Sequence, residues 1–122
     1  MGPTIMRLGT PLVVALLLSA LGFGCASPTG LYDWGRYEES VNAVVFNPER
    51  PADLHTEREL LAQEIRTSLE NHRRIPPGKW AHLGYLCTLT GDNHAARLHF
   101  IAEKTLFPES AALMDFLIGR LK

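Results

Sequence analysis

The sequence predicts an all-α fold, a short stack of about four to five helices that follows an N-terminal export signal. Two observations favour helices. Apolar residues recur at three- and four-residue spacing over residues 53–73, which is typical of an amphipathic helix. No run shows the two-residue alternation of β-branched residues that half-buried strands need. Proline and glycine breaks divide the chain between these stretches.

Composition narrows the class of protein. The 122 residues suit one small domain, and a charged share of 20% with a hydrophobic share of 46% is ordinary globular usage. The net charge is −1, which excludes the clustered basic face that nucleic-acid binding needs. The nearest basic cluster is Arg73, Arg74 and Lys79, and we interpret it as charges that compensate a helix dipole.

Residues 1–24 have the layout of a secretory signal peptide. Arg7 supplies the positive region, and the uncharged run 11–21 is too short to span a bilayer. Small residues follow that run. The segment resembles the signal of bacterial lipoproteins, in which a cysteine after a small residue is lipid-modified and becomes the mature N-terminus. Gly24 and Cys25 fit that pattern, whereas Phe23 departs from it.

Cys25 is therefore predicted to carry the lipid, palmitate-type acyl chains included, with residues 25–31 as a tether. Ordinary signal cleavage, a retained helix and a disulfide with Cys87 are the alternatives. Cys87 lies in an apolar helical stretch and is expected to be a buried, unpaired thiol. By the same resemblance, Ala26 in place of aspartate favours the outer membrane, with the domain facing the periplasm.

Residues 32–122 are predicted to form the helical domain. A first helix is expected over 35–46, ended by Asn47-Pro48. A second is expected over 53–73, with Asp53 and Thr56 as competing N-caps. Its inward stripe is Leu54, Leu61, Ile65 and Leu69, with Leu60 alongside; its solvated face is Glu57, Arg58, Glu64, Arg66 and Glu70.

Residues 79–108 carry the strongest pattern. The spacing W-x-x-L-G, then A-x-x-x-F and a closing proline resembles the tetratricopeptide repeat, a helix-turn-helix unit. The matching residues, with Gly91 in the turn, are Trp80, Leu83, Gly84, Ala96, Phe100 and Pro108. Cys87 and Glu103 depart from the pattern, since an aromatic residue and an alanine are usual there. A generic αα-hairpin is the alternative.

A closing helix is expected over 109–120, with Leu113, Phe116 and Leu117 turned inward to cap the stack. Fewer than three full repeats are rarely stable alone, so the sequence predicts a partner or self-association.

The chain as a whole resembles a family of small bacterial lipoproteins described as a domain of unknown function. The resemblance rests on three stretches, 32–38 (Tyr-x-Trp-Gly-x-Tyr-Glu), 76–91 (Pro-Pro-Gly and the hairpin) and 103–110 (Glu-Lys-x-x-x-Pro-Glu-Ser). It implies a tetratricopeptide-like outer-membrane lipoprotein, often encoded beside a curli-secretion-like lipoprotein. It implies no reaction.

No motif in the sequence predicts a catalytic, cofactor or metal site. His94 and His99 are five residues apart and so do not share a helix face. Histidine or cysteine pairs at metal-ligand spacing, nucleophile motifs and glycine-rich phosphate loops are absent. The sequence therefore predicts a protein that is not an enzyme.

The function expected from these features is a membrane-anchored adaptor that binds another envelope protein. By resemblance, its groove positions are Ala81, Tyr85 and Thr88, with Lys79 and His82 near the rim. Tyr85 could instead pack against the closing helix. The alternative functions are a pilot lipoprotein that escorts a secretion pore subunit, and an enzyme that acts on cell-wall material.

Overall fold

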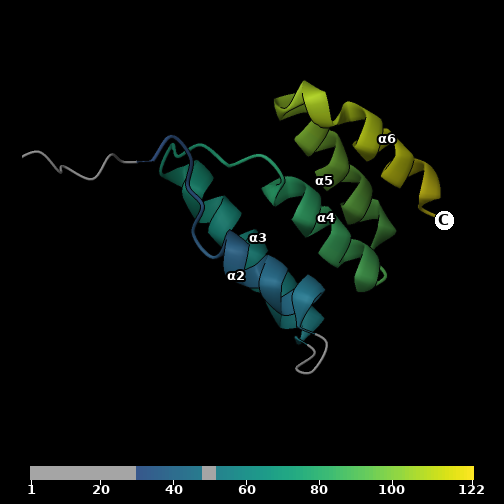
Figure 1. Cartoon of the computed structure of the whole chain (residues 1–122), viewed down its shortest axis with the longest axis horizontal. Helices are drawn as coiled ribbons and strands as arrows, with labels where there is room; N and C mark the ends of the chain where they lie inside the picture. The colour runs from purple at the N-terminus through teal and green to yellow at the C-terminus, as the bar shows by residue number, and fades with distance from the viewer. Residues whose placement is uncertain (1–29, 48–51) are drawn as a thin grey trace, which may run out of the picture. The chain divides into compact units, whose positions relative to one another are not determined.

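Every regular element that the structure describes is helical. The computed structural model describes residues 30–47 and 52–122, and no strand occurs within them. The α-helices are α2 (Tyr37–Val41), α3 (Leu54–Glu70), α4 (Lys79–Leu89), α5 (Asn93–Leu106) and α6 (Ala111–Arg120). They belong to one compact unit, Leu31–Lys122. The all-α prediction is confirmed, whereas residues 1–24 and Cys25 lie outside the described residues (Figure 1).

The N-terminal helix differs from its predicted form. The expected helix over 35–46 begins at Tyr37, and from Asn42 to Phe46 its hydrogen bonding is that of a π-helix, η3. The helix predicted over 53–73 is α3, which ends at Glu70. Asp53 is its N-cap, since its carboxylate accepts from the backbone N–H groups of His55 and Thr56.

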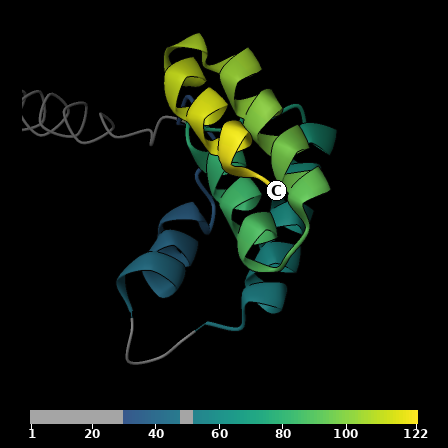
Figure 2. The same cartoon turned by 90° about the vertical axis from the view of Figure 1, so that its right-hand side faces the viewer.

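Helices α4 and α5 form the predicted antiparallel hairpin (Figures 1 and 2). Gly91 turns the chain between them with φ of +82°, a conformation that favours glycine. Gly84 lets the two helices approach, because a Cβ there would lie 2.6 Å from the ring of Phe100. Ala96 is fully buried on the facing side. The small residues at these positions therefore have the packing role that the repeat pattern predicts.

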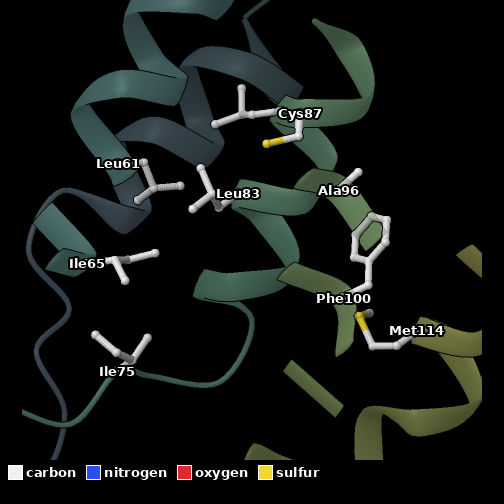
Figure 3. Close-up of a cluster of buried hydrophobic side chains, with 9 residues drawn as sticks. Leu61, Ile65, Ile75, Leu83, Cys87, Ala96, Phe100 and Met114 are labelled. Carbon is white, nitrogen blue, oxygen red and sulfur yellow. The ribbon is translucent and has the colours of Figure 1, made fainter. Parts of the chain in front are cut away.

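The core joins the hairpin to the helices on either side of it (Figure 3). Its side chains come from α3, α4, α5, α6 and the α3–α4 connection: Leu61, Ile65, Ile75, Leu83, Leu86, Cys87, Ala96, Phe100 and Met114. Cys87 is a free thiol, as predicted, and its burial raises the pKa of the sulfur. The thiol therefore stays protonated as a packed core group.

Two predicted apolar stripes are only partly buried. In α3, Leu61 and Ile65 are in the core, but Leu60 and Leu69 are exposed. In α6, Met114 is buried and Leu117 packs against the core as predicted, whereas the expectation that Leu113 and Phe116 point inward is wrong. The apolar residues on the outer side of α6 are therefore at the surface of the described unit.

Candidate functional site

The five residues predicted to bind a partner lie on two different faces of α4. Tyr85 is 42% exposed, Thr88 is exposed, and Ala81 is half-buried. Lys79 is 0% exposed and His82 is buried, so their side chains form no accessible rim, and that expectation is wrong. The physical reason is that both side chains bond to groups of the N-terminal segment, which covers this face of α4.

Lys79 is the centre of a buried polar network. Its ammonium is paired with the carboxylate of Glu64 in α3. It also donates to the backbone carbonyls of Asp33 and Trp34, at 3.1 and 3.3 Å. The same Glu64 carboxylate accepts from the backbone N–H of Arg36, at 3.1 and 3.2 Å to its two oxygens. Lys79 and Glu64 thus clamp residues 33–36 onto α3 and α4. Glu64 is not on a solvated face, and Lys79, the first residue of α4, does not compensate a helix dipole, so both expectations are wrong.

Asp33 adds a second attachment for the same segment. Its carboxylate accepts a 2.7 Å bond from the hydroxyl of Ser68 in α3. Its backbone N–H donates to the carbonyl of Arg74, at 2.8 Å, just after α3 ends. The guanidinium of Arg74 also lies over the ring of Tyr32, 5.3 Å from its centroid. The chain before α2 is therefore held to α3 along several successive residues.

His82 connects α4 to α2. Its Nε2 is 3.1 Å from the hydroxyl of Ser40, and its ring lies edge-on to that of Tyr37. Burial lowers the pKa of His82, against the opposing effects of the Glu57 carboxylate and of the Ser40 backbone. Ser40 is 1% exposed, so its hydroxyl is not open to a reactant. The contact fastens two helices together.

Glu103 caps the N-terminus of α4 from a neighbouring helix. The N-cap of α4 is Gly78, which has no side chain to accept from the first backbone N–H groups. Glu103, on α5, supplies the acceptors instead: its carboxylate accepts from the N–H of Gly78 at 2.6 Å and from that of Ala81 at 3.2 Å. A negative charge is also favourable beside a helix N-terminus. The departure from the repeat pattern at Glu103 therefore has a structural cause.

A family model matches residues 31–117, which is most of the chain. The chain belongs to the family described as Domain of unknown function (DUF4810). No curated protein and no solved structure matches it.

The three stretches that carry the family resemblance meet in this network. The first contributes the Asp33 and Trp34 carbonyls, the second contributes Gly78 and Lys79, and the third contributes Glu103. Tyr37, from the first stretch, lies over Gly78, where a Cβ would be 2.5 Å from its hydroxyl. In this DUF4810 chain the motif residues thus join the N-terminal segment to the hairpin, and the exposed face of α4 lies outside the network.

Metal ligands are not gathered in the described part of the chain. Residues 30–47 and 52–122 contain no group of three or more histidine, cysteine, aspartate or glutamate side chains that could hold a metal ion. His99 is engaged otherwise, since its ring stacks on Trp80 with centroids 5.5 Å apart. Burial lowers the pKa of His99, as it does for His82.

Sequence reasoning missed most of this network. In the sequence, Glu64 is one of several charged residues on the predicted polar face of the helix 53–73, and Lys79 is at the start of the next predicted helix. Nothing local distinguishes a buried charge from an exposed one. The available signal was Glu103, a charged residue at a position where close helix packing calls for a small one.

Proposed function

We propose that this chain is a lipid-anchored adaptor that binds another protein of the bacterial envelope through the exposed face of α4. The observation that carries the proposal is the contrast between the two sides of this helix. Lys79 and Leu83 lock one side into the unit, while Tyr85 and Thr88 are exposed on the other. Leu89 is exposed at the border between the two sides, seven residues beyond the buried His82 and therefore on the same line of the helix. A helix held in this way presents its free face with little loss of conformational entropy on binding.

The chemistry of that face suits protein recognition. Tyr85 offers a large apolar ring with a hydroxyl, and its ring is tilted against that of His82, with centroids 6.5 Å apart. Leu89 is 42% exposed one turn further along the helix. Tyrosine is enriched among residues that dominate binding energy. We assign partner contact to Tyr85, Thr88 and Leu89, with Ala81 at the edge of the face.

The anchor in this proposal is Cys25, after removal of residues 1–24. Several acyl chains on one residue give stable attachment, whereas one gives only marginal binding. The compact unit begins at Leu31, six residues after Cys25. Six extended residues span roughly 20 Å, so the α4 face would be held close to the membrane surface. None of the described helices is both long and apolar enough to cross a membrane.

The partner we propose is a lipoprotein of the curli-secretion-like kind, which the family resemblance implies is often encoded beside this one. Both would then be anchored in the outer membrane and face the periplasm. A partner on the same membrane meets the α4 face at a raised effective concentration, so a modest contact area is sufficient.

The test compares two exposed residues of the lipidated full-length chain. Tyr85→Ala is expected to reduce crosslinked capture of that neighbouring lipoprotein about tenfold or more, as loss of a central aromatic contact does. Leu98→Ala, on α5, removes a similarly exposed apolar side chain away from α4 and is expected to leave capture unchanged. Both variants should keep the circular dichroism and melting temperature of the parent.

In the same experiment, Cys25→Ser tests the membrane anchor independently of the exposed face of α4. It is expected to release the protein from the membrane fraction and to lower capture through lost proximity. Equal capture by Tyr85→Ala and Leu98→Ala would refute the α4 assignment. Retention of Cys25→Ser in the membrane fraction would refute the anchor.

A further inference from the structure

The outer face of α6 carries large apolar side chains that are exposed. Leu113 and Phe116 are 58% and 57% exposed, and Ala112 beside them is exposed as well. An exposed leucine and phenylalanine one turn apart therefore indicate a surface that another molecule covers.

Charged residues of opposite sign close the two ends of this apolar stripe. Glu109 stands in the 3₁₀ turn that leads into α6, and Arg120 is the last residue of the helix. Leu113, Phe116 and Arg120 are spaced by three and four residues within α6 and so lie on one side of it, and Glu109 precedes Leu113 by four residues, in the turn just before the helix. Within the described ranges, neither Glu109 nor Arg120 takes part in an ion pair.

On the flank of the stripe, Asp115 already has an ion-pair partner within the unit. Asp115 is paired with Lys104 of α5, which directs its charge toward the body of the unit. The guanidinium of Arg120 lies over the ring of Phe116, 4.9 Å from its centroid. A shallow, open depression next to Phe116 is lined by Gly119 and Arg120 among others, and a Cβ on Gly119 would meet no atom within 4 Å apart from its chain neighbours and its own helix backbone. The stripe thus combines an apolar ridge with an open space beside it.

This pattern is self-complementary. When two α6 helices are laid antiparallel so that Glu109 faces Arg120 of the second copy, Leu113 faces Phe116 of that copy. The twofold axis repeats both contacts, so one interface contains two ion pairs and two apolar contacts, as isologous interfaces do. Leu113 of the second copy would then enter the depression beside Phe116. We infer that the outer face of α6 binds a second copy of this chain in this antiparallel register.

The area of the outer face of α6 determines how strong self-association is expected to be. One helix face with two large apolar side chains buries much less than the roughly 800 Å² per partner of stable interfaces. The free chain is therefore expected to be monomeric at micromolar concentration and to dimerise in a dense layer. Such a layer exists if the chain is lipid-anchored, a step that rests on the proposed function. The test below does not depend on it.

Charge reversal provides the test because each copy contributes both ends of the stripe. Glu109→Arg alone and Arg120→Glu alone each place like charges opposite one another twice. Each is expected to weaken self-association of the purified full-length chain in detergent about tenfold, measured by sedimentation velocity over a concentration series. Phe116→Ser, which removes the apolar contact, is expected to abolish it. All four residues of the stripe are exposed, so these variants should fold as the parent does.

A mixture of the two single variants distinguishes this register from any other. In the mixed dimer the introduced arginine of one copy would face the introduced glutamate of the other. The unchanged Arg120 of the first copy would face the unchanged Glu109 of the second, so both pairs are again attractive. The 1:1 mixture and the double variant Glu109→Arg/Arg120→Glu are both expected to recover the association of the parent chain.

Failure of both the mixture and the double variant to recover association would overturn the inference. So would a parent chain that stays monomeric up to about 1 mM, well above the concentration at which an interface of this size is expected to form. Capture of a different protein by this face would then identify its occupant.

Discussion

Replacing Lys79 with methionine tests whether the buried network holds the N-terminal segment in place. Methionine keeps most of the apolar volume of the lysine stem and removes the ammonium. Glu64 then loses its counter-charge, and the carbonyls of Asp33 and Trp34 lose their donor. The change therefore leaves a partly buried carboxylate and two carbonyl groups without the partner that they have in the native structure.

The size of the effect follows from the burial of the pair. Breaking a buried ion pair by removing one partner costs about 3–5 kcal/mol, because an uncompensated charge stays behind. Lys79 is fully buried, but the Glu64 side chain is 20% exposed, which places the cost near the lower end, about 3 kcal/mol. For a unit of this size that corresponds to a fall in melting temperature of about 12–24 °C.

The assay is chemical denaturation of the purified protein combined with hydrogen exchange. The amide of Arg36, which donates to Glu64, should lose protection first in the Lys79→Met variant. Glu64→Gln in the same background should recover part of the loss, because it removes the unpaired charge. Lys104→Met is the matched control, since its pair with the exposed Asp115 is worth about 1 kcal/mol or less.

Equal stability losses for Lys79→Met and Lys104→Met would refute the reasoning. So would unchanged exchange at residues 33–36, because the network would then not be what holds that segment.

Two further predictions concern Glu103 and pH. Glu103→Ala restores the usual residue of the repeat pattern, yet it should destabilise the fold by about 1–3 kcal/mol, because two backbone N–H groups at the start of α4 lose their acceptor. Chemical denaturation measures this loss, with Glu109→Ala as the control at an exposed position. Burial lowers the pKa of His82 and of His99 below 6.5, so the folded state binds fewer protons than the unfolded state below that pH. The free energy of unfolding should therefore fall as the pH is lowered from about 7.5 to about 5.5, and a His82→Asn/His99→Gln variant that keeps the full slope would contradict the assignment.

Much of the fold could be predicted from local patterns. Helix α3, the α4–α5 hairpin, the turn at Gly91 and the burial of Cys87 are all present as expected. Helical periodicity and turn chemistry act over a few residues, so they are visible in the sequence. The π-helical end of the first helix was missed, because the same residues are compatible with either hydrogen-bond pattern.

The site was predicted less well, for a different reason. Of the five residues assigned to a groove on α4, Tyr85 and Thr88 are exposed and Lys79 and His82 are buried. Periodicity in the sequence predicts which side of a helix is polar. A polar side chain is nevertheless buried when a segment distant in the sequence supplies its hydrogen-bond or ion-pair partners. For Lys79 those partners are Asp33, Trp34 and Glu64, which are 46, 45 and 15 residues away.

The sequence by itself determined that this chain is helical, where its hairpin turns and which small residues allow the helices to approach. The tertiary structure alone decided which charges are buried, since a lysine or glutamate leaves water only where a counter-charge from another element meets it. It also decided that Met114 is the buried residue of α6 and that Leu113 and Phe116 are exposed, because an apolar side chain is covered only where another element packs against that side of its helix.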